Sequence, residues 1–146
     1  MNRVKRMQPV LRIAEIEVDK AGQMVASAAQ QLKAEQQKLQ QLASYQQEYG
    51  QRMITAGQAG ITADQLRLYD RFREQLENAL THQKSRIAQC ETVLANCKKQ
   101  WQTKDIRHKS LEKLLTRLKR EADLALQKSE QKNHDEFARH SAKRHW

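Results

Sequence analysis

Apolar side chains recur every seven residues along two stretches of this chain, separated by a break that contains glycine. In the first stretch the repeating positions are Leu11, Val18, Val25, Leu32 and Leu39, with a companion row at Ala14, Ala21, Ala28, Leu42 and Tyr49. In the second they are Leu66, Leu80, Ile87, Leu94, Trp101 and Leu115, with companions at Tyr69, Leu76, Cys90, Cys97, Leu111 and Leu118. Two such rows form one apolar face on a helix, and a strict seven-residue repeat makes paired helices supercoil left-handedly. The pattern predicts an all-α, antiparallel coiled-coil hairpin of two long helices.

The breaks in the pattern set the expected helix ends. The first helix is expected over about residues 9–49, because Pro9 suits a first helical turn. Glycines at positions 50, 57 and 60 predict a loop over about 50–61. Thr62 and Gln65 have capping-box spacing, so the second helix is expected over about 62–130. Residues 131–146 lose the periodicity and are expected to form a frayed basic tail, and residues beyond about 110 to project past the start of the shorter helix. The whole chain, 1–146, is then a single coiled-coil domain with unequal arms.

Composition agrees with long solvated helices and disfavours catalysis. The chain has four glycines, one proline and 30% charged residues, a profile typical of extended helices. No apolar run approaches the roughly 20 residues of a membrane span, and no apolar block follows the basic N-terminus. We therefore expect a cytoplasmic protein. Cys90 and Cys97 are expected to be reduced core residues, and the histidines have no arranged catalytic partners. The sequence thus predicts no enzyme activity, no metal and no cofactor.

Positive charge is concentrated in two segments. The chain carries a net charge of +10, and residues 98–120 contain nine basic and two acidic residues. Arg3, Lys5, Arg6 and Arg12 precede the first acidic residue, Glu15. Antiparallel pairing brings these like-charged segments together, which is unfavourable without an acidic partner. Nucleic acid is one such partner, and a ring or groove of acidic protein side chains is another. Few aromatic residues accompany the charges, so nucleic acid is not expected.

Aromatic residues gather on both sides of the glycine-rich break. Tyr45 and Tyr49 are one turn apart in the first helix, and Tyr69 and Phe72 occupy neighbouring turns of the second. Filling of the core explains the two residues that lie on the apolar stripe, Tyr49 and Tyr69. Tyr45 and Phe72 lie off the stripe, and aromatic residues on an otherwise polar surface are typical of protein contacts. We therefore predict a docking patch here, with core packing as the alternative.

Local strings in the sequence resemble the FliJ family of the bacterial flagellar type III export apparatus. The segment Ser44-Tyr45-Gln46-Gln47-Glu48-Tyr49 is similar to the family's Tyr-Gln-x-Glu-Tyr string at the end of its first helix. The segment from Phe72 to Ala79 is similar to the counterpart on the second helix, and Asp135-Glu136-Phe137-Ala138 to a string near the C-terminus. These strings occur in the family's order over the full length.

The resemblance implies a flagellar export component that is the central stalk of the export ATPase. Such a stalk inserts into a FliI-like hexamer as the gamma stalk does in rotary ATPases, promotes ring assembly, binds the export gate protein FlhA and interacts with export chaperones. It would be cytoplasmic and peripheral on the cytoplasmic face of the inner membrane at the flagellar base. The family's gate-binding surface corresponds to Leu42, Tyr45, Tyr49, Phe72, Leu76 and Ala79. Two further positions of that surface depart from the family pattern: Lys38 replaces a usual Gln, and Gln83 a usual His, with His82 beside it.

The basic segments fit the pore of such an ATPase ring. The residues predicted to bind the ring are Arg3, Lys5, Arg6, Arg12, Arg117, Lys119 and Arg120. Two alternatives remain from the sequence. One is the equivalent stalk of a virulence-type type III secretion system, and the other, from a different class, is a basic nucleic-acid-binding coiled coil.

Overall fold

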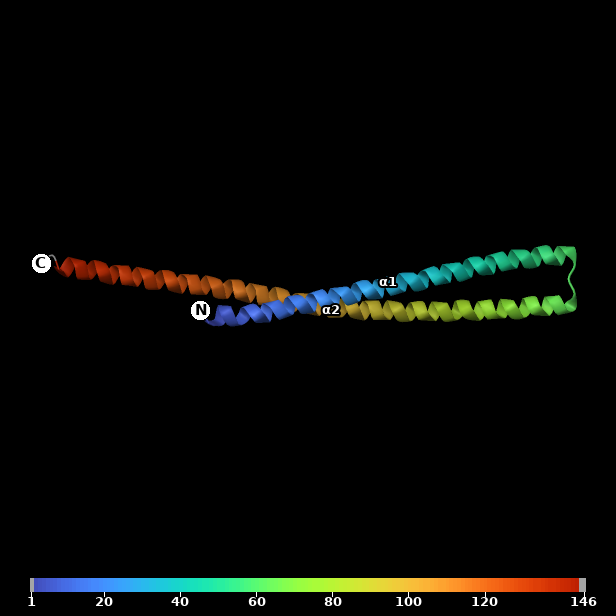
Figure 1. Ribbon diagram of the computed structural model, residues 1–146, viewed down its shortest axis with the longest axis horizontal. Coiled ribbons are helices and arrows are strands. Elements are labelled where there is room, and N and C mark those ends of the chain that lie inside the picture. The colour runs from blue at the N-terminus through green and yellow to red at the C-terminus, as the bar shows by residue number, and fades with distance from the viewer. Residues whose placement is uncertain (1, 145–146) are drawn as a thin grey trace. The chain divides into compact units, whose positions relative to one another are not determined.

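The fold consists of two long α-helices joined by a short connection (Figure 1). The computed structural model describes residues 2–144, with α1 at Asn2–Ala59 and α2 at Ala63–Arg144. Within these residues there is no β-strand, so the prediction of an all-α fold with two long helices packed against each other is confirmed. The contacts divide into two units, 21–101 and the combination of 1–20 with 102–146. That the chain forms a single coiled-coil domain stays a prediction.

The connection between the helices is much shorter than the loop expected at 50–61. Helix α1 continues through Gly50 and Gly57 to Ala59, and within residues 2–144 only 60–62 lie outside a helix. A glycine inside a helix costs only about 1 kcal/mol relative to alanine, so helix formers around it keep the helix intact. Gly60, by contrast, has a φ of +91°, which favours glycine. The chain therefore turns at Gly60 and not at the earlier glycines.

Both helices also extend further than expected at the opposite ends. Helix α1 begins at Asn2, not near residue 9, and contains Pro9 within it. Proline removes one backbone hydrogen bond, but the helix continues on both sides of it, and the side chains of Val4 and Met7 in the preceding turns are half-buried. Helix α2 continues to Arg144 because it contains no glycine or proline, so the described part of the expected frayed tail, 131–144, is helical. Residues 145 and 146 lie outside the described residues.

The start of α2 is capped as the sequence predicts. The backbone N–H of Thr62 donates to Oε1 of Gln65 at 3.0 Å, and the backbone N–H of Gln65 donates to Oγ1 of Thr62 at 3.2 Å. These reciprocal bonds form a capping box, which satisfies two backbone donors at the helix start. The cap fixes where α2 begins relative to the turn at Gly60.

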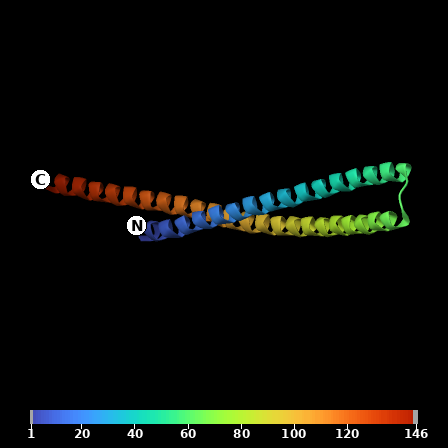
Figure 2. The same ribbon diagram turned by 45° about the vertical axis from the view of Figure 1, so that its right-hand side comes forward.

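In the unit of residues 21–101, α1 and α2 run side by side in opposite directions (Figures 1 and 2). Leu76 is its buried apolar residue, and two polar residues, Glu35 and Gln83, are also buried. Trp101 packs over Gly22, where an added Cβ would lie 3.6 Å from the indole ring. Gly22 thus marks a close approach of a side chain from the partner helix.

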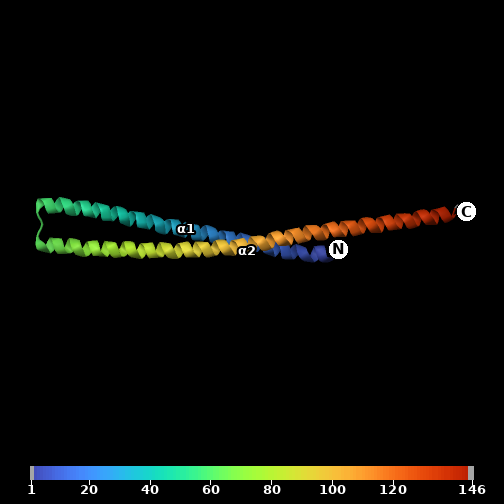
Figure 3. The same cartoon turned by 180° about the vertical axis from the view of Figure 1, so that it is seen from behind.

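In the other unit, residues 2–20 of α1 pack against α2. Ala14, Leu115 and Leu118 form the buried core. The expectation that residues beyond about 110 project uncovered is therefore wrong for the segment up to Leu118, because α1 starts earlier than Pro9 and covers it. Beyond this core, α2 continues past the first turn of α1 (Figure 3). No helix among residues 2–144 is long and apolar enough to span a lipid bilayer.

Candidate functional site

Four aromatic rings meet across the two helices in the unit of residues 21–101. The ring centroids of Tyr49 and Phe72 are 4.5 Å apart, those of Tyr49 and Tyr69 are 5.5 Å apart, and those of Tyr45 and Phe72 are 6.0 Å apart with an edge-to-face arrangement. These separations are within the range at which aromatic pairs attract. The antiparallel pairing therefore brings together the aromatic residues that the sequence placed on either side of the turn.

We call the six predicted gate-binding residues the aromatic patch: Leu42, Tyr45, Tyr49, Phe72, Leu76 and Ala79. Tyr45 is 46% exposed, whereas Leu76 is buried and the other four are half-buried. Phe72 is therefore not a fully exposed ring, because it packs against both tyrosines of α1. The patch combines an interhelical packing role with a surface that remains accessible, chiefly at Tyr45.

The hydroxyl group of Tyr49 stays neutral to higher pH than usual. Burial raises the pKa of Tyr49, and the neighbouring hydroxyls of Tyr69 and Tyr45 raise it further. A neutral phenol can both donate and accept a hydrogen bond. The patch thus offers apolar ring surface together with uncharged polar groups.

Glu35 is the most deeply buried side chain among the residues whose burial the structure describes, and sequence reasoning missed it. It is 1% exposed. The side-chain amide of Gln83 donates to the backbone carbonyl of Glu35 at 2.9 Å and to its carboxylate at 2.5 Å. Gln31 donates to the other carboxylate oxygen at 3.1 Å. Hydrogen bonding from Gln83, followed by the positive charges of Arg86 and Lys38, lowers the pKa of Glu35 despite its burial.

Lys38 and Gln83, the two positions predicted from the resemblance to depart from the family's surface, both contact this carboxylate. Lys38 Nζ lies 3.5 Å from Glu35 Oε1, and Gln83 makes the bonds described above. Arg86 approaches the same oxygen at 3.8 Å. Gln83 is therefore engaged inside the helix pair and not on the accessible surface, and Lys38 is directed partly toward Glu35.

The seven predicted ring-binding residues, which we call the basic surface, are all exposed and lie in the same unit. They are Arg3, Lys5, Arg6 and Arg12 on α1, and Arg117, Lys119 and Arg120 on α2. Arg12 pairs with Glu15 at 3.5 Å, and Arg117 lies 3.9 Å from Glu121. Exposed pairs of this kind contribute little to stability, so these cations are accessible to an acidic partner.

Carboxylates surround one histidine of this unit, contrary to the expectation that no histidine has such partners. His108 Nδ1 lies 3.0 Å from Glu112, and its Nε2 lies 3.6 Å from Glu15 of the opposite helix. Lys104 pairs with Glu17 across the same helices at 3.1 Å. The Lys104–Glu17 ion pair and the approach of His108 to Glu15 join α1 to α2, whereas the His108–Glu112 contact lies within α2. Among residues 2–144 no group of three or more potential ligands could hold a metal ion.

The fold and these surfaces define an all-α chain in which two long paired helices present an aromatic patch and a basic surface. The sequence profile of the flagellar FliJ protein family matches residues 3–145. The chain is also 29% identical over 132 residues to the flagellar FliJ proteins of Escherichia coli K12 and Salmonella typhi, covering 90% of each chain. No solved structure matches it.

The chain belongs to the flagellar FliJ family, which confirms the resemblance of the local strings. The family is a non-catalytic component of flagellar protein export, so this chain is a flagellar export component. The prediction of a flagellar export component is thereby confirmed.

Proposed function

We propose that this chain is the central stalk of the flagellar export ATPase and couples the ATPase ring to the export gate protein FlhA. In this proposal the basic surface contacts a FliI-like hexamer and promotes its assembly, and the aromatic patch contacts the cytoplasmic region of FlhA. Export chaperones are further partners. The chain has no catalytic activity of its own and works at the cytoplasmic face of the inner membrane through these partners.

The observation that carries the proposal is the separation of two chemically different surfaces into two units. The aromatic patch belongs to residues 21–101 and offers apolar rings with neutral hydroxyls, whereas the basic surface belongs to the other unit. An acidic ring and an apolar gate segment would therefore bind different parts of the chain. One chain with two such surfaces is suited to link two partners.

Tyr45→Ala tests the gate contact. Tyr45 is 46% exposed and meets Phe72 in an edge-to-face arrangement, so its removal should leave helicity nearly unchanged. Truncating a central aromatic residue of an interface commonly costs 2 kcal/mol or more. We expect the affinity for the purified cytoplasmic region of FlhA to fall more than tenfold in a titration. Tyr45→Ala combined with Phe72→Ala should weaken binding further, with some loss of thermal stability because Phe72 is half-buried.

Phe137→Ala is the matched control for the gate experiment. Phe137 is 72% exposed and belongs to the other unit, so its loss should not change gate binding. Retained affinity in Tyr45→Ala and in the double variant would refute the docking role of the patch. Equal losses in the control and the patch variants would show that affinity responds to exposed aromatic residues in general.

A triple charge reversal tests the ring contact. Arg117, Lys119 and Arg120 replaced together by Glu should reduce stimulation of the ATPase while circular dichroism shows unchanged helicity, because all three side chains are exposed. Reversal of Arg67, Arg71 and Arg73 in the other unit is the control and should leave stimulation intact. Raising the salt concentration should also weaken the wild-type contact, since exposed charges are screened over about 10 Å at 0.1 M. Full stimulation by the triple variant would refute the charge-based contact.

A further inference from the structure

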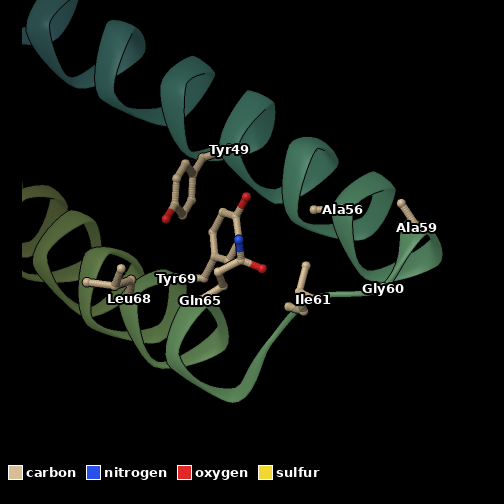
Figure 4. Close-up of a pocket in the computed structure, with 8 residues that line it drawn as sticks. All are labelled: Tyr49, Ala56, Ala59, Gly60, Ile61, Gln65, Leu68 and Tyr69. Atoms are coloured by element: carbon tan, nitrogen blue, oxygen red, sulfur yellow. The ribbon is translucent and has the colours of Figure 1, made fainter.

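A cavity opens between the helices where the chain turns from α1 to α2 (Figure 4). Its volume is about 420 Å³, within the range of pockets that bind ligands. Tyr49 and Ala56 of α1 line it, together with Ile61 of the connection and Leu68 and Tyr69 of α2. In Figure 4 the rings of Tyr49 and Tyr69 both project into the space between the helices. We call this cavity the tip pocket.

The tip pocket continues the aromatic patch along both helices. On α2, Leu68 lies four residues before Phe72, so the two side chains share a helix face. On α1, Ala56 lies seven residues after Tyr49, two turns further along the same face. Tyr49 itself belongs to the patch and lines the pocket. A partner segment that covers Tyr45 and Phe72 thus meets the pocket one or two turns further on.

The surroundings of the tip pocket favour an apolar, uncharged occupant. Leu68 is 63% exposed, so its apolar side chain is accessible to a partner at the wall of the pocket. None of the residues that line the pocket is charged, and the nearby aspartates of α2 are paired, Asp64 with Arg67 at 3.3 Å and Asp70 with Arg73 at 3.7 Å. The pocket therefore offers no net charge to attract an ionic group. Ala56, Ile61 and Leu68 give the wall apolar surface that fits an aliphatic or aromatic side chain, and Gln65 adds a polar group beside the two tyrosines.

From this arrangement we infer that the tip pocket holds an aliphatic or aromatic anchor side chain of the same gate segment that contacts the aromatic patch. The inference rests on the proposed gate contact and adds a specific subsite to it. The phenol groups of Tyr49 and Tyr69 supply hydrogen-bonding groups beside the anchor. A large apolar side chain seated in a cavity is the arrangement that concentrates binding energy in protein interfaces.

Two variants test the pocket in opposite ways. Leu68→Gln removes apolar surface from its wall, and Ala56→Phe fills the cavity with a side chain of this chain itself. Each should weaken binding to the cytoplasmic region of FlhA at least fivefold in a titration. Leu124→Gln, at a residue 52% exposed in the other unit, is the matched control and should bind normally. Circular dichroism on every variant checks that helicity is retained.

Measuring Tyr45→Ala in parallel separates this inference from the proposed function. Loss of affinity in Tyr45→Ala, Leu68→Gln and Ala56→Phe supports both. Loss in Tyr45→Ala with normal binding by both pocket variants overturns the anchor pocket and leaves the gate contact standing. Normal binding by all three variants overturns both ideas. Weakened binding by Leu124→Gln equal to that of Leu68→Gln also overturns the pocket, since general apolar exposure would then explain the effect.

Discussion

Replacing each glycine by alanine tests where the helices end. The substitution is expected to raise the stability of the fold inside a helix and to lower it in the connection. Gly22, Gly50 and Gly57 lie inside α1, whereas Gly60 lies outside and has a φ of +91°. Alanine in a helix interior is favoured over glycine by about 1 kcal/mol. Alanine at a positive φ is instead disfavoured by about 1–2 kcal/mol. Three of the substitutions should therefore stabilise the chain and the fourth should destabilise it.

The space around each glycine decides whether alanine gives its full increase in stability. Apart from atoms of its own helical turn, nothing lies within 4 Å of a Cβ added at Gly50 or Gly57. A Cβ added at Gly22 meets two ring atoms of Trp101 at 3.6 Å, an ordinary van der Waals distance. Gly22→Ala should therefore stabilise the chain as much as Gly50→Ala and Gly57→Ala do, and it should add a packing contact with Trp101. For a chain of this size, 1 kcal/mol corresponds to a shift in Tm of roughly 2–4 °C.

Thermal unfolding followed by circular dichroism at 222 nm measures these shifts. Gly50→Ala and Gly57→Ala should each raise the Tm, and Gly60→Ala should lower it. A fall in Tm for both Gly50→Ala and Gly57→Ala would refute the continuous helix and restore a loop over 50–61. A fall for Gly22→Ala alone would mean that Trp101 approaches α1 too closely for a methyl group.

Three further predictions follow from individual contacts. Thr62→Ala removes one of the two capping-box hydrogen bonds and should destabilise the chain by about 1 kcal/mol, seen as a lower Tm. Leu76→Ala leaves a cavity at a buried position and should cost about 2–4 kcal/mol in chemical denaturation, whereas Leu124→Ala should cost little. The pKa of Glu35 is lowered below its usual 4.5. The ionised carboxylate therefore stabilises the fold above pH 4.5, and this contribution is lost as the pH falls through the lowered pKa. The Tm of the wild type should thus drop more steeply below pH 4.5 than that of Glu35→Gln; parallel curves would contradict this.

The fold was predictable because the seven-residue repeat is a property of the whole chain. Each of the two stretches carries many apolar positions in one phase, so no single exception changes the conclusion. The predicted positions of the helix ends depended instead on single residues such as Pro9 and Gly50. Each of these costs a helix only a few kcal/mol at most, and neighbouring packing or strong helix formers outweigh that cost. Local signals of this size predict a weak point in a helix more reliably than its end.

The aromatic cluster was predictable in outline and not in detail. Antiparallel pairing about a turn necessarily brings Tyr45 and Tyr49 near Phe72. How far each ring is exposed depends on the rotation of the two helices about their axes, which the repeat defines only approximately. Phe72 lies off the apolar stripe in sequence, yet its ring reaches Tyr49 at 4.5 Å. An aromatic side chain is long enough to reach the interface from a flanking position, so its half-burial could not be derived from spacing alone.

The sequence does indicate the buried polar contact between Glu35 and Gln83, but a search for apolar positions alone does not detect it. Glu35 occupies the repeat position between Ala28 and Leu42, and Gln83 occupies the one between Leu76 and Cys90. Glu35 is thus the one polar residue in its row between Ala14 and Tyr49, and Gln83 is one of two in the row of α2, with Lys104 as the other. The structure pairs Glu35 with Gln83. A polar residue within a coiled-coil stripe is commonly used to fix the register of the helices, because any shifted pairing leaves its buried groups without partners. Here a shift of one heptad would place Glu35 against an apolar side chain. The same contact therefore holds Tyr45 and Tyr49 opposite Phe72 and Tyr69, and it maintains the geometry on which the aromatic patch depends.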